Sequence, residues 1–321
     1  MTVTVFKFIS IFLLFATFVQ CGTTMIVVPV MRPAEVNLGK IKKIAVGRVS
    51  GEAAADVEDD LIGQLIETQT FDVLDRSNLD KIIREYRLSM SELIDEKTAL
   101  QLGNLLGAAA LIFARVADHR YGEQVLEGQP YKDKDGRTHM RHTREGKAQV
   151  TINFRITDLT TGRFIFSRDI THTATAQTNA VDGRPVRIDD SELLRSARRI
   201  VVRQFVSRIA PHWENVSVRL LTDSELPELE SGISYAKIRE WDRAIESFKS
   251  ATERHVGHES RHKAFYNLGV AYEYSSRFEE AVAALHKAHE LEPDNDYLAE
   301  IESCRRRERE YKKLQEQLRE E

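Results

Sequence analysis

A repeated segment near the C-terminus constrains the fold of this chain more than any other feature. Residues 232–251 recur 37 positions later as residues 269–288, with similar residue types at matching places. Small and bulky apolar residues stand three or four positions apart in each copy, a spacing that puts them on one helix face. The matching pairs are Gly232 and Gly269, Tyr235 and Tyr272, Trp241 and Phe278, Ala244 and Ala281, Phe248 and Leu285, and Ala251 and Ala288. This self-similarity predicts two stacked helix pairs, because one pair alone cannot bury its apolar face.

The second copy resembles the tetratricopeptide repeat. It carries Phe265-x₂-Leu268-Gly269-x₂-Tyr272, followed by Ala281-x₃-Leu285 and Pro293. The resemblance implies an all-α domain of two repeats over residues 223–293, with a groove that takes a peptide or helix from a protein partner. We expect residues 294–321 to form a capping helix and a charged tail. The expected repeat-packing residues are Gly232, Tyr235, Ala244, Phe248, Phe265, Leu268, Gly269, Tyr272, Ala281, Leu285 and Pro293.

The N-terminus has the pattern of an export signal. Lys7 precedes an apolar run from Phe8 to Gln20, which is too short to span a bilayer comfortably, and Cys21 follows directly. We interpret residues 1–20 as a lipoprotein signal peptide and Cys21 as the lipid acceptor, with residues 21–40 as a linker. A plain secretory signal or an uncleaved anchor is the alternative, because Phe18, Val19 and Gln20 are not the small residues usual before such a cysteine.

Residues 41–222 alternate between strand and helix patterns. Strands are predicted at 41–49, 71–74 and 108–116, and a hairpin at 149–158 and 163–173; helices are predicted at 56–69, at 96–106, from Ser77 onward, and at 189–209. The expected fold class is therefore α/β, a sandwich of one mixed sheet with helices.

Two phrases in this region resemble the CsgG-like lipoproteins of curli secretion. They are Phe-Asp-Val-Leu-Asp-Arg-Ser-Asn-Leu-Asp-Lys-Ile at 71–82 and Leu-Gly-Asn-Leu-Leu-Gly-Ala at 102–108, followed by a strand, a hairpin and a long helix. The resemblance covers about residues 41–209 and implies a bacterial envelope lipoprotein. The best-known member of that family is an outer-membrane oligomer that exports fibre subunits through a pore, and other members resemble envelope scaffolds or enzyme activators.

An insertion at residues 118–147 argues against the pore role. It carries many Lys, Arg, Asp and Glu residues, and no stretch of about ten residues offers the apolar face that a lipid-facing strand needs. We expect a solvated hairpin or a mobile flap around Lys134, Asp135 and Gly136.

Catalytic and metal-binding patterns are weak in this sequence. The expectation for His119, His139, His142 and His172 is exposure to solvent without a metal, and Cys304 stands alone on a charged helix. The arginines of the 189–209 helix are expected on a solvated face, with an acidic partner or lipid headgroups as the alternative; they are Arg195, Arg198, Arg199 and Arg203. The two cysteines exclude a disulfide framework, and a net charge of −4 argues against nucleic-acid binding. We therefore expect no enzyme activity, no cofactor and no metal.

The leading hypothesis is a non-enzymatic lipoprotein of the outer membrane that faces the periplasm. It would act in assembly, with its repeats bound to other envelope proteins and a lipid anchor in the membrane, and the role is compatible with a homo-oligomer. The alternative is an outer-membrane secretion channel, or an accessory component of a curli-type export system.

Overall fold

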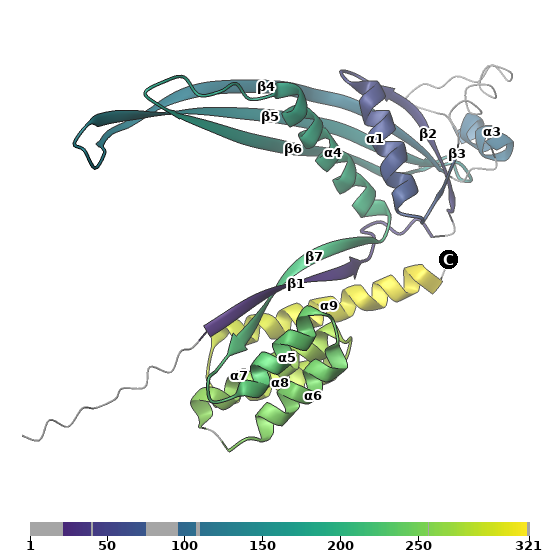
Figure 1. The fold of residues 1–321 in the computed structure, drawn as a ribbon. Coiled ribbons are helices and arrows are strands. Elements are labelled where there is room, and N and C mark those ends of the chain that lie inside the picture. Colours follow the sequence, from purple (N-terminus) through teal and green to yellow (C-terminus); the bar gives the residue numbers. More distant parts are fainter. Residues whose placement is uncertain (1–21, 40, 75–95, 107–109, 256, 320–321) are drawn as a thin grey trace, which may run out of the picture. The chain divides into compact units, whose positions relative to one another are not determined.

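The computed structural model describes residues 22–39, 41–74, 96–106, 110–255 and 257–319 (Figure 1). The chain divides into two units. The sheet unit comprises Met31–Trp213 and Lys313–Glu321, and the repeat unit comprises Met1–Val30 and Glu214–Lys312. No helix in the described ranges is long and apolar enough to cross a membrane.

The sheet unit is built on five strands in the order β3-β2-β4-β5-β6. β2 is parallel to β3 and β4, whereas β5 is antiparallel to both β4 and β6. The mixed sheet predicted from the sequence is therefore confirmed. Its strands are β2 Lys43–Ser50, β3 Asp72–Leu74, β4 Ala110–Lys132, β5 Thr138–Asp158 and β6 Phe164–Val181.

Helices α1 (Ala54–Glu67) and α4 (Asp190–Ile209) cover one face of this sheet (Figure 1). Phe205 of α4 stacks on Phe154 of β5 with a centroid distance of 4.1 Å in the main apolar core. α3 (Glu96–Leu106) packs Ala99 and Leu102 into a smaller apolar cluster with Leu111 and Phe113 of β4. The two helical layers thus bury both faces of the sheet near β2.

The outer parts of β4, β5 and β6 extend beyond the helices as a long three-stranded arm (Figure 1). The predicted hairpin over residues 118–147 is therefore present, as the continuation of two sheet strands. At its tip the Asp133 carboxylate accepts hydrogen bonds from the N–H groups of Asp135 and Arg137, both at 2.9 Å. Gly136 follows with a φ of 78°, a backbone conformation that favours glycine.

The repeat unit combines a two-stranded ribbon with five helices. The ribbon pairs β1 (Gly22–Arg32) with β7 (His212–Thr222), which run in opposite directions (Figure 1). The helices are α5 Pro227–Lys237, α6 Trp241–Glu253, α7 His258–Tyr274, α8 Phe278–Leu291 and α9 Asn295–Arg319. One apolar core joins ribbon and helices, with Ile26 and Leu220 beside Ile233, Phe248 and Leu285.

Two expectations about boundaries need revision. The predicted linker at residues 21–40 instead contains β1, because Ile26 and Val28 are buried against the repeats. β7, assigned from the sequence to the α/β domain, packs with the repeats from Glu214 onward. Residues 295–319 form one continuous helix, α9, over the segment predicted to be a capping helix and charged tail. The helix predicted from Ser77 onward lies outside the described residues.

Candidate functional site

The first helix of the second repeat, α7, holds strand β7 of the ribbon. The Asn267 side chain is fully buried and faces the main chain of Leu221. Its amide oxygen accepts a hydrogen bond from the Leu221 N–H, and its amide nitrogen donates one to the Leu221 C=O, both at 2.8 Å. Asn267 therefore binds β7 as a neighbouring strand would, because it pairs with the backbone N–H and C=O of Leu221 and makes no hydrogen bond to a side chain of β7.

A buried ion pair fixes the residue that follows the ribbon. The Lys263 ammonium lies 2.6 Å from the Asp223 carboxylate, and both side chains are almost completely buried. Burial alone would raise the pKa of Asp223. Hydrogen bonds from Lys263, the Glu225 N–H and Ser260 outweigh burial and hold that pKa below its usual value. Breaking such a pair on one side is costly, because the other charge stays buried.

These contacts change the interpretation of the repeat groove. In stacked repeats the first helix of each pair lines the inner surface that receives ligands. Here the Lys263 and Asn267 side chains, one helical turn apart on α7, already hold the chain's own β7. The surface expected to receive a partner is thus filled in part by an internal strand.

The predicted packing residues lie mostly at the contacts between helices. A Cβ added to Gly232 would stand 2.3 Å from the Phe248 ring, and one added to Gly269 would stand 2.7 Å from Leu285 Cγ. Ala244, Phe248, Ala281 and Leu285 are fully buried, and Leu268 is buried. Tyr235, Phe265 and Tyr272 are half-buried against the same core, and Pro293 is exposed after α8.

An open groove of about 310 Å³ remains between β7 and the helices. Four consecutive residues of β7, Val216–Arg219, and Met25 of β1 line the ribbon side, and Tyr266 and Tyr274 of α7 and one face of α9 line the rest. The Arg219 guanidinium crosses the groove, 5.5 Å from the centroid of the Tyr266 ring, and reaches the Asp296 carboxylate at 2.8 Å.

Two carboxylates meet beside this groove. Glu273 of α7 is only 1% exposed, and Arg307 Nε lies 3.5 Å from its Oε1. Burial, and then the charge of Glu300, raises the pKa of Glu273 to about 8. Burial likewise raises the pKa of Glu300, which lines the groove. The site therefore carries unusual acidic groups that the sequence did not single out.

Comparison with protein-family models identifies the family to which the sheet unit is related. The model described as "Curli production assembly/transport component CsgG" matches residues 22–210, which is more than half of the chain. The chain belongs to the CsgG family. A tetratricopeptide-repeat model matches residues 262–295, which cover most of α7 and all of α8. Both resemblances seen in the sequence are thus confirmed.

Solved structures similar to this CsgG-family chain include three bacterial proteins. The hypothetical protein CT253 from Chlamydia trachomatis is 11% identical with a TM-score of 0.34, covering 52% of this chain and 95% of its own. A PelC dodecamer from Paraburkholderia phytofirmans is 17% identical with a TM-score of 0.28, covering 58% and 100%. Lipoprotein GNA1162 from Neisseria meningitidis is 12% identical with a TM-score of 0.30, covering 51% and 97%. No curated protein matches the chain.

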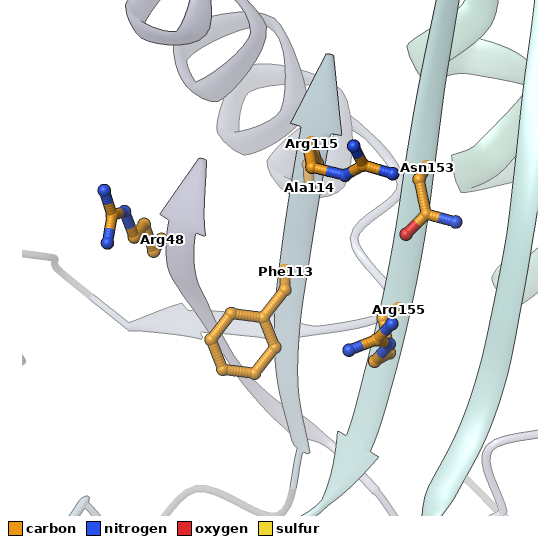
Figure 2. A pocket seen from close by; sticks show the side chains of 6 residues that line it. All are labelled: Arg48, Phe113, Ala114, Arg115, Asn153 and Arg155. Carbon is orange, nitrogen blue, oxygen red and sulfur yellow. The ribbon is translucent and has the colours of Figure 1, made fainter. Parts of the chain in front are cut away.

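A second pocket, of about 210 Å³, lies on the CsgG-family sheet (Figure 2). Its lining consists of Arg48, Phe113, Ala114, Arg115, Asn153 and Arg155. The Arg115 side chain extends toward Asn153, whereas Arg48 lies across Phe113 from the other two arginines (Figure 2). Arg155 packs over the Phe164 ring, 5.1 Å from its centroid. None of the six lining residues is acidic, so the pocket suits an anionic group better than a cation.

The histidines of the arm are more ordered than the sequence predicts. His139 lies between two carboxylates, with Nδ1 2.6 Å from Asp182 and Nε2 3.0 Å from Asp133. These hydrogen bonds, first Asp182 and then Asp133, raise the pKa of His139. The His119 side chain is 10% exposed, with Nδ1 3.1 Å from Glu52. His142 and His172 are half-buried. The expectation of four freely exposed histidines is therefore wrong, because strand pairing brings distant acids beside two of them.

One further expectation, about the arginines of α4, needs correction. Arg198 is buried and pairs with Asp56 at 3.0 Å and Asp60 at 2.8 Å, so it joins α4 to α1 and does not lie on a solvated face. Cys304 is fully buried in the repeat core, and this burial raises the pKa of its thiol to about 12. Cys21 lies outside the described residues, and its lipidation stays a prediction.

Sequence reasoning missed Asn267, Lys263 and the Glu273–Glu300 pair. In the sequence these residues are marked only by being polar or charged at positions of α7 and α9 that the repeat pattern assigns to buried helix faces. Recognising it requires knowing that β7 and α9 pack against α7, and that information is long-range.

Proposed function

We propose that this CsgG-family protein is a lipid-anchored, non-enzymatic assembly factor of the bacterial envelope. Cys21 carries the lipid, and the repeat unit binds another envelope protein. The protein resides in the outer membrane and faces the periplasm.

One observation carries the proposal: β1 starts at Gly22, directly after Cys21, and packs into the core of the repeat unit. A lipid on Cys21 would therefore be joined to a folded unit without a flexible linker. One extended residue spans only about 3.3–3.6 Å, so the repeats would be held at the membrane surface. Such a placement favours the capture of a membrane-associated partner, since two proteins confined to one surface meet at a raised effective concentration.

The anchor is tested by replacing its acceptor. Cys21→Ala should abolish metabolic acyl labelling and release the protein from the membrane fraction, with Cys304→Ala as the matched cysteine control. Full acyl labelling of the Cys21→Ala chain would contradict the lipoprotein assignment. Density-gradient separation of the two membranes then tests the outer-membrane location.

The adaptor role is tested by capture from detergent-solubilised envelopes, with the mass of the complex measured in parallel. A specific partner should be retained by the full chain and lost with Gly269→Leu, which overpacks the second repeat. It should be retained when the arm tip is altered by His139→Ala. A partner that binds equally to all three chains would argue that the repeats do not hold it.

A further inference from the structure

The groove beside β7 runs along the edge of that strand. Successive side chains of a strand point to opposite faces, so a cavity lined by four consecutive residues reaches both faces of the strand, as a cavity along its edge does; Met25 of β1 lines one end of it. Val216–Arg219 line the groove in this way. β7 has only β1 as a neighbour among the described strands, so its other edge is open to pairing.

The contacts of Leu221 show which backbone groups point into the groove. In a strand that pairs antiparallel, the N–H and C=O of one residue face the same edge, and the direction alternates along the chain. Both groups of Leu221 are bound by Asn267 of α7, so Leu221 faces away from β1. Arg219 and Ser217, two and four residues earlier, therefore direct their backbone groups toward the same edge. Asn267 occupies the first position of a ladder whose next positions open into the groove.

The opposite wall suits an extended chain. Asp296, Ala299, Glu300 and Ser303 of α9 face the groove with helical spacing, and Ala299 and Ser303 are small enough to leave room for a backbone. A helix with its side chains is about 10–12 Å across. A space of about 310 Å³ is too narrow for that and fits a short extended segment.

The charges around the groove favour a basic side chain. Asp296 is already paired with Arg219. Glu300 lines the groove next to Glu273, and the two carboxyl groups share a hydrogen bond, which requires that one of them holds a proton. Arg219, Arg306 and Arg307 lie near this pair, and their positive charges lower the pKa values of the glutamates. The pKa of each glutamate is nevertheless raised above its usual value, because burial outweighs these charges. An added cation would let both carboxylates ionise.

We propose that this groove binds an extended segment of a partner protein, which adds a third strand along the free edge of β7 and directs a lysine or arginine toward Glu300. The inference rests on the adaptor role proposed above and specifies the chemistry of the partner. Backbone pairing to Ser217 and Arg219 would supply affinity, and the basic side chain would supply selectivity.

The probe is a library of random heptapeptides displayed on phage and selected on the full chain in detergent. Selected peptides should place a Lys or Arg between β-branched residues. A synthetic copy should bind about tenfold more weakly to Ser217→Pro, which removes an N–H that points into the groove, and to Glu300→Gln. The matched controls are Asn215→Pro, on the same edge but outside the groove, and Glu302→Gln, on another face of α9; neither should change binding by more than about twofold.

The outcomes separate this proposal from the adaptor role. Thermal melts of Ser217→Pro and Glu300→Gln establish that both chains are folded. The groove assignment is overturned if no peptide is selected, or if the selected peptides bind both variants as well as the parent. It is also overturned if light scattering shows an oligomer that dissociates with Ser217→Pro, because the occupant is then a second copy. If the parent and both variants capture the same partner from envelopes, the adaptor role is supported, but the groove is not the site that binds this partner.

Discussion

Replacing Asn267 should loosen the ribbon from the repeats. In Asn267→Ala the two hydrogen bonds to Leu221, both 2.8 Å long, are lost at a site with no access to solvent. The Leu221 N–H and C=O then stay buried without partners. Leaving a buried polar group unpaired costs about 1–3 kcal/mol, so the free energy of unfolding of the repeat unit should fall by roughly 2–4 kcal/mol.

Urea unfolding followed by tryptophan fluorescence measures this change. The chain has two tryptophans: Trp213 lies in the sheet unit and is 67% exposed, and Trp241 lies in the repeat unit. A Trp213→Phe background therefore reports on the repeat unit alone. With a urea dependence of about 2 kcal/mol per molar, the midpoint should fall by about 1–2 M.

The exposed Asn215 of the ribbon provides the control. Asn215→Ala should change the unfolding free energy by less than about 0.5 kcal/mol, as surface substitutions usually do. If the unfolding free energy of Asn267→Ala also changes by less than about 0.5 kcal/mol, Asn267 does not hold β7. Faster hydrogen exchange in β7 of the Asn267→Ala chain, with β5 unchanged, would confirm that the loss is local.

Three other results are expected. Gly269→Leu should lower the free energy of unfolding of the repeat unit by roughly 1–3 kcal/mol, because the larger side chain overpacks against Leu285. Limited proteolysis should then cut within residues 223–312 and spare the sheet unit; cleavage of both units would refute the division into two units. The contacts of His139 with Asp182 and Asp133 at the arm tip should persist below the raised pKa of His139 and weaken as the pH rises through that pKa. NMR titration should give His139 a higher pKa in the parent chain than in Asp182→Asn, and equal values would show that Asp182 does not stabilise the charged imidazole. The purified chain should give no conductance in planar bilayers, because the arm carries Arg144 with Glu123 on one face and Glu145 with Gln124 on the other; single channels lost on shortening residues 118–147 would favour the secretion-channel alternative.

Features that depend on the spacing of neighbouring residues can be predicted from this sequence. The glycines and alanines of the two repeats predict helix pairs because Gly232 and Gly269 stand where a Cβ would collide with the partner helix. Period-two alternation located β5 and β6, and Asp189 marks the start of α4, where its carboxylate accepts a hydrogen bond from the Glu192 N–H. These patterns reflect interactions between residues a few positions apart, so a single sequence contains them.

The position of the ribbon, in contrast, depends on contacts between segments far apart in the chain. β1 and β7 pair with each other and pack on the repeats across about 190 residues of chain, so the local pattern at Gly22–Arg32 by itself predicts only a linker. The same holds for Arg198, which meets Asp56 and Asp60 only when α4 packs beside α1. The Asn267 contact and the raised pKa of Glu273 likewise arise from burial by elements distant in sequence. Burial depends on the whole packed chain, and the local pattern of residues does not encode which segment will supply it.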